Sequence, residues 1–427
     1  HDHKYDPITQ KDYYQLFGFF NTSKESGFEG DVNASKPAKK PILTLSDKEV
    51  SEILTFINKP DTGTVSVSVM GEMDTARTTY ILNRGAYDKH GDAVKSTALE
   101  AVLPFDTLLY PRNRLGLAQW TITKDNPLTA RVFVNQLWQE LFGTGLVKTT
   151  GDFGMQGNLP THPELLDWLA VDFMEHNWDI KRLVKQILMS TSYRQSSEIK
   201  EQHLALDPDN LYLARAPRLR FKAEFIRDMV LETSQLLVKE IGGPSVKPYQ
   251  PKGLWEGATS GRGVLKTYEQ DKENALYRRG MYTFIKLTLP PPSMIVFDAS
   301  NRDQCEVKRS RTNTPLQAFI MMNDPTVLEA SRVFAQHLQA ENRAVDDKIA
   351  AAFRSIICRK ASPKELGILK EYYAEQLQLF RAKQLNALKT LAVGDSPVNK
   401  TLDLDESAAL MKVVNTIYNM EEAITKS

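Results

Sequence analysis

From residue 112 onward, apolar side chains recur every three or four positions, which is the spacing of amphipathic helices. One such run includes Val134 and Trp138 on the same face. Asn126-Pro127 before this run predicts a helix start, because asparagine caps the first turn and proline fits the first helical position. Gly143 after it predicts the helix end. The chain is therefore expected to be mainly α-helical beyond residue 112.

Other helix starts are marked by residues that cap the free amides of a first turn. Thr161 and Glu164 have the spacing of a capping box. Asp324-Pro325 and Ser362-Pro363 are further predicted starts, and Glu365 completes a capping box at the second. The last predicted helix carries an apolar face made of Leu410, Val413, Val414, Ile417 and Tyr418.

The first part of the chain follows a different pattern. Residues 64–70 alternate as TVSVSVM and predict a strand, and residues 78–82 predict a second one. We therefore expect a small β module over residues 60–111, followed by a helical domain over residues 112–427. Residues 22–59 are interpreted as a linker with a short helix near 47–58.

Composition narrows the class of protein. The chain has 427 residues, a formal charge of +1, 41% apolar residues and 25% charged residues, as in an ordinary globular protein. Near-neutrality argues against a nucleic-acid partner, and no run approaches the ~18 apolar residues of a membrane span. Cys305 and Cys358 are too few for a four-thiolate zinc site, and their neighbourhoods favour two free thiols over one disulfide.

Residues 242–314 interrupt the helical pattern with a long segment rich in proline, glycine and arginine. Long ordered segments without regular structure are often functional. Residues 278–311 hold seven basic and three acidic side chains, a local surplus of +4. If these cations gather in one concavity before the helix that begins at Thr314-Pro315, they suit a carboxylate, sulfate or phosphate ligand.

The candidate site residues come from this segment. The predicted ligand-binding residues near its end are Arg302, Arg309, Arg311 and Asn313, and the candidate catalytic residues are Asp298 and Cys305. The alternative interpretation is that these arginines pair with acids of neighbouring helices and hold the segment in place. Tyr249 and Trp255 are predicted to stack on a sugar ring through an exposed aromatic face, whereas Trp138, Trp168 and Trp178 are expected in the core.

Three histidines are further candidates. His162, in the first turn of a predicted helix, is interpreted either as a neutral catalytic donor or acceptor or as a capping residue. His1 and His3 could hold Cu(II) or Ni(II) together with backbone nitrogens if His1 is the true N-terminus. Otherwise they are two residues apart on one face of a strand, or an ordinary pair.

Three strings carry a family resemblance, at residues 126–170 (beginning NPLTARVFVNQLW), 191–197 (TSYRQSS) and 278–325 (beginning RRGMYTFIKLTLPPPSM). They resemble the C-terminal domain of unknown function of the planctomycete-type cytochrome c (PSD-type) multidomain proteins. The opening HDHKYDPITQKDYYQLFGFF resembles the end of the companion domain that precedes it there. Residues 1–21 are therefore expected to be the tail of an upstream cytochrome-c-associated domain.

The resemblance implies that His1 is the histidine of a C-x-x-C-H haem motif whose cysteines precede this chain. Haem c is then expected in the intact protein, with an upstream half of the same protein as partner. This chain alone cannot attach a haem covalently. The resemblance also implies a periplasmic, cell-surface or secreted protein in organisms that degrade sulfated polysaccharides.

The functional hypothesis is therefore an extracytoplasmic protein that handles a sulfated or acidic polysaccharide, with any redox chemistry at an upstream haem. Two alternatives stay open. One is a non-catalytic glycan-binding or scaffold protein, and the other is a hydrolase that acts through residues 298–313. The sequence does not decide whether the chain is an enzyme.

Overall fold

The computed structural model describes residues 1–24, 41–45, 65–259, 265–287, 289–300, 302 and 304–426. Within these ranges the chain forms two compact units. The described residues up to 217 form the N-terminal unit, and those from 218 onward form the C-terminal unit. The boundary falls inside the helical domain predicted for residues 112–427. The short helix predicted near residues 47–58 lies outside the described residues.

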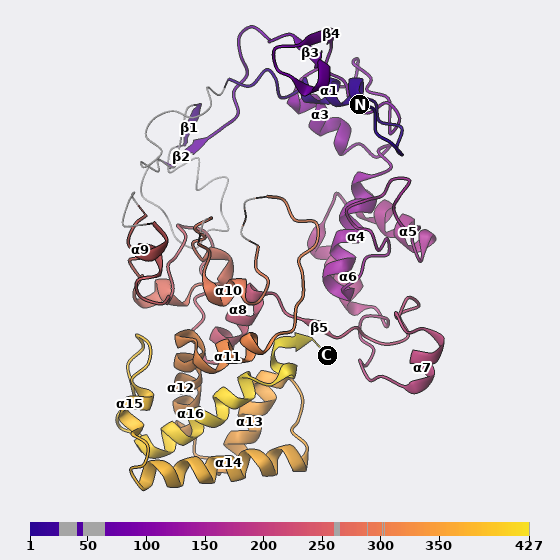
Figure 1. Ribbon diagram of the computed structural model, residues 1–427. Coiled ribbons are helices and arrows are strands. Elements are labelled where there is room, and N and C mark those ends of the chain that lie inside the picture. The colour runs from indigo at the N-terminus through magenta and orange to yellow at the C-terminus, as the bar shows by residue number, and fades with distance from the viewer. Residues whose placement is uncertain are drawn as a thin grey trace. The chain divides into compact units, whose positions relative to one another are not determined.

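The N-terminal unit contains small sheets and several helices (Figure 1). Its strands are β1 (Ile42–Leu45), β2 (Val65–Ser68), β3 (Thr79–Leu82) and β4 (His90–Val94). Its helices are α1 (Gln10–Phe17), α3 (Arg114–Thr121), α4 (Thr129–Phe142), α5 (Pro163–Glu175), α6 (Ile180–Met189), α7 (Glu201–Leu206) and the 3-10 turn η1 (Asn83–Gly85).

The predicted β module is present as two separate antiparallel pairs, β1 with β2 and β3 with β4. Both predicted strands are confirmed, and β3 pairs with β4, which begins at His90. Helix α1 packs against β3, and a small core of Phe19, Phe105 and Trp120 lies in this part of the unit.

A second core in the N-terminal unit lies among α4, α5 and α6. The ring of Phe133 stacks on Phe173 at 5.1 Å between centroids, and Trp138 is buried as predicted. Trp178 also packs against this core, as expected. Trp168 is 54% exposed, so its predicted core position is wrong. The reason is its place on α5, where the buried residues Leu166, Leu169, Ala170 and Phe173 define the opposite face.

The caps of these helices differ partly from expectation. Helix α4 begins at Thr129 rather than after Asn126, whose side-chain oxygen accepts the backbone amides of Leu128 and Thr129. Gly143 ends the helix with a φ of 84°, a conformation that glycine adopts without steric cost. The capping box predicted for Thr161 is wrong, because that residue bonds Leu146 through its backbone amide instead.

The C-terminal unit is built almost entirely of helices. They are α8 (Ala223–Thr233), α9 (Leu254–Thr259), α10 (Pro292–Ile295), α11 (Pro315–Asn323), α12 (Pro325–Ala340), α13 (Val345–Ile357), α14 (Pro363–Arg381), α15 (Ala387–Leu391), α16 (Leu404–Tyr418) and the 3-10 turns η2 (Glu273–Tyr277), η3 (Gly280–Tyr282) and η4 (Glu421–Ile424). Its one described sheet pairs β5 (Leu219–Arg220) with β6 (Thr425–Lys426).

Helix α16 is the centre of this unit and packs against α12, α13, α14 and α15 (Figure 1). All five apolar residues predicted for its buried face are buried. The side chain of Asp324 caps α12 and a Ser362–Glu365 capping box begins α14, so both predicted starts are confirmed. The mainly α fold class is confirmed, with residues 242–314 forming only short helical turns in their described part. None of the described helices combines the length and apolar character of a membrane span.

The capping box of α14 gives the first testable prediction. Arg359 donates to both carboxylate oxygens of Glu365 at 2.7 and 3.0 Å, and the backbone amide of Ser362 donates to the same group at 2.7 Å. These bonds, Arg359 first, lower the pKa of Glu365 from 4.5 to about 2. A carboxyl group whose pKa is lowered in the folded state stabilises the fold at pH values above its ordinary pKa. This stabilisation is lost as the pH falls toward the pKa of the folded state.

We therefore expect Glu365→Gln to lower the free energy of unfolding near pH 7 by ~1 kcal/mol or less, because the pair is partly exposed. This difference from wild type should shrink as the pH falls below 4.5. Urea denaturation between pH 3 and 7 measures it. Glu375→Gln, on the exposed face of the same helix, is the control and should show no such trend. Parallel pH profiles for Glu365→Gln and wild type would contradict the prediction.

Candidate functional site: an arginine-lined pocket

A pocket of about 190 Å³ lies beside the β5–β6 sheet of the C-terminal unit. Successive side chains of a strand point to opposite faces, so Arg218, just before β5, and Arg220 within it share a face. Arg220 pairs with Thr425 of β6 across the sheet. The pocket is lined by Arg218, Leu219, Arg220, Arg311, Thr312, Asn313, Glu421, Ile424 and Thr425.

Arg220 is the anchor of this pocket. Its Nε donates to the carbonyl of Thr312 at 2.9 Å, and its Nη1 donates to the carbonyls of Phe221 and Phe297 at 3.1 and 3.3 Å. Its Nη2 forms an ion pair with Asp298, and these two side chains are only 10% and 15% exposed. The end of the irregular segment is therefore fixed onto β5 by one guanidinium group.

The electrostatics of the pocket favour an anion. Burial lowers the pKa of Arg220, and the nearby Arg311 guanidinium lowers it further, while Asp298 opposes both effects. Arg311 is exposed and forms no ion pair with any residue that the structure describes. Arg218 lies 3.5 Å from Glu421, so the lining holds three guanidinium groups and one carboxylate. Guanidinium groups match sulfate, carboxylate and phosphate oxygens with directed hydrogen bonds.

Two of the predicted ligand-binding residues, Arg311 and Asn313, line this pocket. Asp298 does not line it but supports it, because its carboxylate also accepts the backbone amide of Thr312 at 2.9 Å and the hydroxyl of Thr312 at 3.0 Å. Asp298 therefore contacts Arg220 and Thr312, which are both in the lining of the pocket.

The other predicted residues of the segment do not line this pocket. Arg309 donates to both carboxylate oxygens of Glu224 in α8 at 2.9 and 3.0 Å, which agrees with the alternative interpretation of an internally paired arginine. Arg302 is exposed, and its Nη2 lies 3.5 Å from the carbonyl of Met281. Cys305 is an exposed free thiol, and Cys358 is also free. The expectation that the basic side chains of this segment gather in one concavity is therefore wrong for these residues.

Tyr249 and Trp255 do not present the exposed faces that sugar stacking requires. Trp255 is 1% exposed, and its ring is covered by the Lys286 Nζ at 4.5 Å from the ring centroid and by the edge of Tyr268. The hydroxyl of Tyr249 donates to the buried carboxylate of Glu329 at 2.9 Å. The prediction of exposed aromatic faces is wrong because Trp255 is buried and Tyr249 is half-buried.

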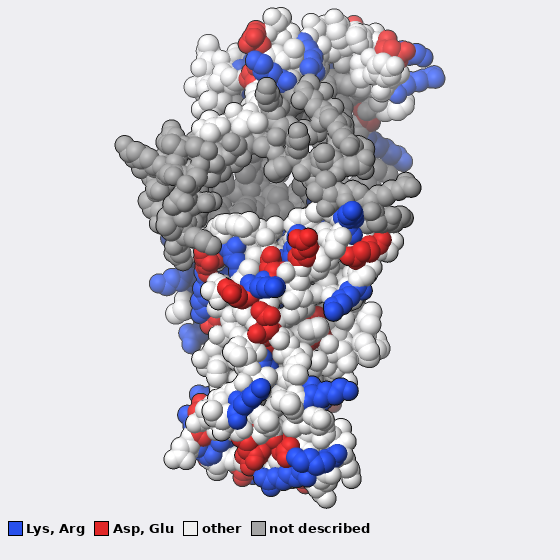
Figure 2. All heavy atoms as spheres, turned by 90° about the vertical axis from the view of Figure 1, so that its left-hand side faces the viewer, with Lys and Arg blue, Asp and Glu red and all other residues white. Residues whose placement is uncertain are grey.

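Sequence reasoning missed Arg218 and Arg220, which precede the predicted segment. The available signal was the alternation in APRLRF at residues 216–221, which places two arginines on one face of a short strand. Elsewhere on the C-terminal unit, Figure 2 shows basic and acidic side chains interspersed over the visible face, without a field of one sign. The arginine-lined pocket is a local concentration of positive charge, whereas the face seen in Figure 2 carries both signs.

The histidine candidates lie in the N-terminal unit. The Nδ1 of His162 lies 3.0 Å from the hydroxyl of Thr161, and His162 occupies the N-cap position of α5. The Nδ1 of His3 accepts the backbone amide of Asp6 at 2.9 Å. Among the described residues no cluster of three His, Cys, Asp or Glu side chains has a metal-binding arrangement. His1 is exposed.

The residues present do not fit a covalently attached haem. Covalent attachment in c-type proteins uses a C-x-x-C-H motif, in which the ligand histidine directly follows the second of two cysteines. The two cysteines of this chain, Cys305 and Cys358, are both exposed and belong to the C-terminal unit, whereas His1 belongs to the N-terminal unit. No chemical step is therefore assigned to a haem on this chain.

Comparison with known families identifies the family of the chain. The model of the family described as protein of unknown function DUF1553 (PSD1) matches residues 113–373. The chain belongs to this family. The DUF1553 family is a domain of unknown function in planctomycete-type cytochrome c proteins, so this part of the resemblance is confirmed. The match includes most of the helical part and all three arginines of the arginine-lined pocket, Arg218, Arg220 and Arg311. Searches of curated proteins and of solved structures found no match.

Proposed function

We propose that this DUF1553 protein is an extracytoplasmic substrate-handling protein that binds sulfated or acidic polysaccharide at the arginine-lined pocket. The observation that supports the proposal most is the convergence of Arg218, Arg220 and Arg311 on one pocket with a single carboxylate in its lining. A sulfate ester or a uronate carboxylate would accept hydrogen bonds from Arg311 and Arg218, which are not fixed by carbonyl contacts as Arg220 is. Asn313 adds an amide that can bond a sugar hydroxyl.

The proposal favours binding over hydrolysis at this pocket. General acid–base chemistry needs a titratable group within hydrogen-bonding reach of the substrate. Glu421 is the one carboxylate in the lining, and the candidate nucleophile Cys305 does not line the pocket. The pocket therefore supplies hydrogen-bond donors and positive charge, which position an anionic sugar without breaking it.

The family context supports the rest of the proposal. We place redox chemistry, if the intact protein performs any, at haem c bound by an upstream part of the same protein in the periplasm or at the cell surface. The test is the absorption spectrum of the intact protein, in which covalent haem gives a Soret band and a pyridine haemochrome. An intact protein without either would reject the haem part of the proposal and leave the pocket part intact.

The binding part predicts a specific loss of affinity. Arg311→Ala and Arg218→Ala should each weaken binding of a sulfated oligosaccharide about 10- to 100-fold, since a hydrogen bond to a charged group contributes ~1.5–3 kcal/mol. Isothermal titration calorimetry with the sulfated oligosaccharide measures the effect, and the desulfated oligosaccharide should bind weakly to every variant.

Arg302→Ala is the matched control. It removes the same charge from an exposed position that does not line the pocket, and it should change the affinity less than about threefold. Equal losses in Arg302→Ala and Arg311→Ala would show that only overall charge matters. Unchanged binding in Arg311→Ala and Arg218→Ala, or no binding by the wild-type protein, would reject the pocket as the site.

A further inference from the structure

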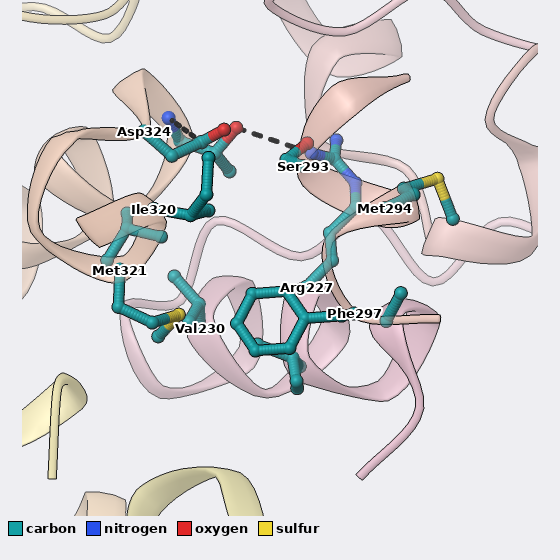
Figure 3. A pocket seen from close by; sticks show the side chains of 12 residues that line it. Arg227, Val230, Ser293, Met294, Phe297, Ile320, Met321 and Asp324 are labelled. Atoms are coloured by element: carbon teal, nitrogen blue, oxygen red, sulfur yellow. Dashed lines mark hydrogen bonds between the residues drawn. The ribbon is translucent and has the colours of Figure 1, made fainter. Parts of the chain in front are cut away.

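A second cavity lies in the C-terminal unit among α8, α10, α11 and α12 (Figure 3). Its volume is about 50 Å³. Figure 3 shows polar side chains at one end, Arg227, Ser293 and Asp324, and apolar ones, including Phe297, at the other. The full lining is Ala223, Ile226, Arg227, Val230, Ser293, Met294, Phe297, Ile320, Met321, Asp324, Thr326 and Val327.

The chemistry of this cavity centres on Arg227. Its Nη2 donates to the carbonyl of Leu276 at 2.5 Å, and its Nη1 reaches the hydroxyl of Thr326 at 3.4 Å. The Nε is buried and has no hydrogen-bond partner. No carboxylate among the described residues lies within ion-pair distance of this guanidinium group. A buried cation without a direct counter-charge is costly to maintain.

The carboxylates nearest to Arg227 are engaged elsewhere. Asp324 caps α12 by accepting the backbone amide of Thr326 at 2.8 Å, and burial raises the pKa of Asp324. Asp228 accepts the backbone amide of Gly280 at 2.7 Å. Burial lowers the pKa of Arg227, and the fields of Asp324 and Asp228 oppose this shift without forming a contact. The charge of Arg227 is thus balanced only at a distance.

We propose that this cavity binds a short-chain monocarboxylate, such as butyrate. The carboxylate would accept hydrogen bonds from Arg227 and Ser293, and the alkyl chain would lie against Phe297, Ile320 and Met321. Ligand pockets typically combine an apolar lining with a few converging polar groups, as this one does. The small volume excludes a sugar ring from the enclosed part, so this site is distinct from the arginine-lined pocket.

The test titrates the full chain with butyrate and, separately, with butanol, which has the same carbon chain without the charge. We expect butyrate to bind at least tenfold more tightly than butanol, as measured by isothermal titration calorimetry or by NMR line broadening of the ligand. Arg227→Met, which keeps a long side chain without the charge, should weaken butyrate binding at least tenfold. Arg311→Ala should leave butyrate binding unchanged, which separates this site from the arginine-lined pocket.

Two further variants keep the test decisive if Arg227→Met fails to fold. Val230→Ile adds one methylene to the cavity wall, and it should reduce butyrate affinity at least threefold. Arg279→Met removes an exposed charge that does not line the cavity, and it should have no effect. Equal affinity for butyrate and butanol, or wild-type affinity in Val230→Ile, would overturn the proposal.

Discussion

Replacing Glu329 by alanine should lower the free energy of unfolding of the C-terminal unit by ~3–5 kcal/mol, the cost of leaving a buried charge without its partner. Glu329 is fully buried in α12 and accepts the hydroxyls of Tyr249 and Tyr277 at 2.9 Å each. It also accepts the backbone amide of Ser396 at 2.7 Å and lies 3.7 Å from Arg332, which is equally buried. The substitution removes all four interactions together.

The hydrogen bonds from Tyr249 and Tyr277 to Glu329 should persist in moderate alkali. Burial and the neighbouring Glu329 carboxylate raise the pKa of Tyr249 and of Tyr277, so both hydroxyls remain protonated donors. Removing one of them is therefore expected to cost less than removing the acceptor. Tyr277→Phe should lower the free energy of unfolding by ~1.5–3 kcal/mol, the range for a lost hydrogen bond to a charged group.

Two units need not unfold in one step, so the measurement should report on α12 itself. Hydrogen exchange of α12 peptides during urea denaturation, followed by mass spectrometry, gives the local stability. Glu341→Ala, at the exposed end of the same helix, is the matched control and should change the stability by less than ~1 kcal/mol. Equal effects of Glu329→Ala and Glu341→Ala would show that the buried network contributes nothing specific.

Local signals in the sequence were enough to predict much of the helical fold. The starts of α12 and α14 depend on Asp324 and Ser362 bonding backbone amides two or three residues away. The apolar spacing of α16 likewise lies within one helix, and every residue predicted for its core face is buried. Such features depend on neighbours in the chain, so periodicity and capping rules identify them.

The candidate pocket depends on contacts that local patterns do not contain. Arg220 meets Thr312 and Asp298, which are 92 and 78 residues further along the chain. The segment that ends in Arg311 was recognised as basic, but its charge count could not show that Arg309 pairs with Glu224 in α8. Choosing the arginines that face one pocket requires the pairing of β5 with β6, whose two-residue length gives little sequence signal.

Asp298→Ala should be the second strongly destabilising substitution, with an expected loss of ~3–5 kcal/mol for breaking a buried ion pair. Asp298 pairs with Arg220 and holds Thr312 through two hydrogen bonds at 2.9 and 3.0 Å. Its φ of 56° adds to the effect, because aspartate tolerates this left-handed conformation better than alanine does. Hydrogen exchange of peptides covering residues 304–314 measures the local loss.

The same substitution distinguishes two electrostatic roles for Asp298. Removing its negative charge alone would favour an anion in the arginine-lined pocket by ~1 kcal/mol at exposed, water-like screening. Without Asp298, Arg220 and Thr312 lose the contact that orients them in the lining of the pocket. A hydrogen bond from either residue to a charged ligand contributes ~1.5–3 kcal/mol. The second effect is larger, so Asp298→Ala should weaken binding of a sulfated oligosaccharide about tenfold or more.

Glu306→Ala, which removes a carboxylate 3.9 Å from Arg309 on the same segment, should leave both stability and binding nearly unchanged. Tighter binding and unchanged stability in Asp298→Ala would mean that Asp298 acts only as a competing charge and that another contact positions Arg220.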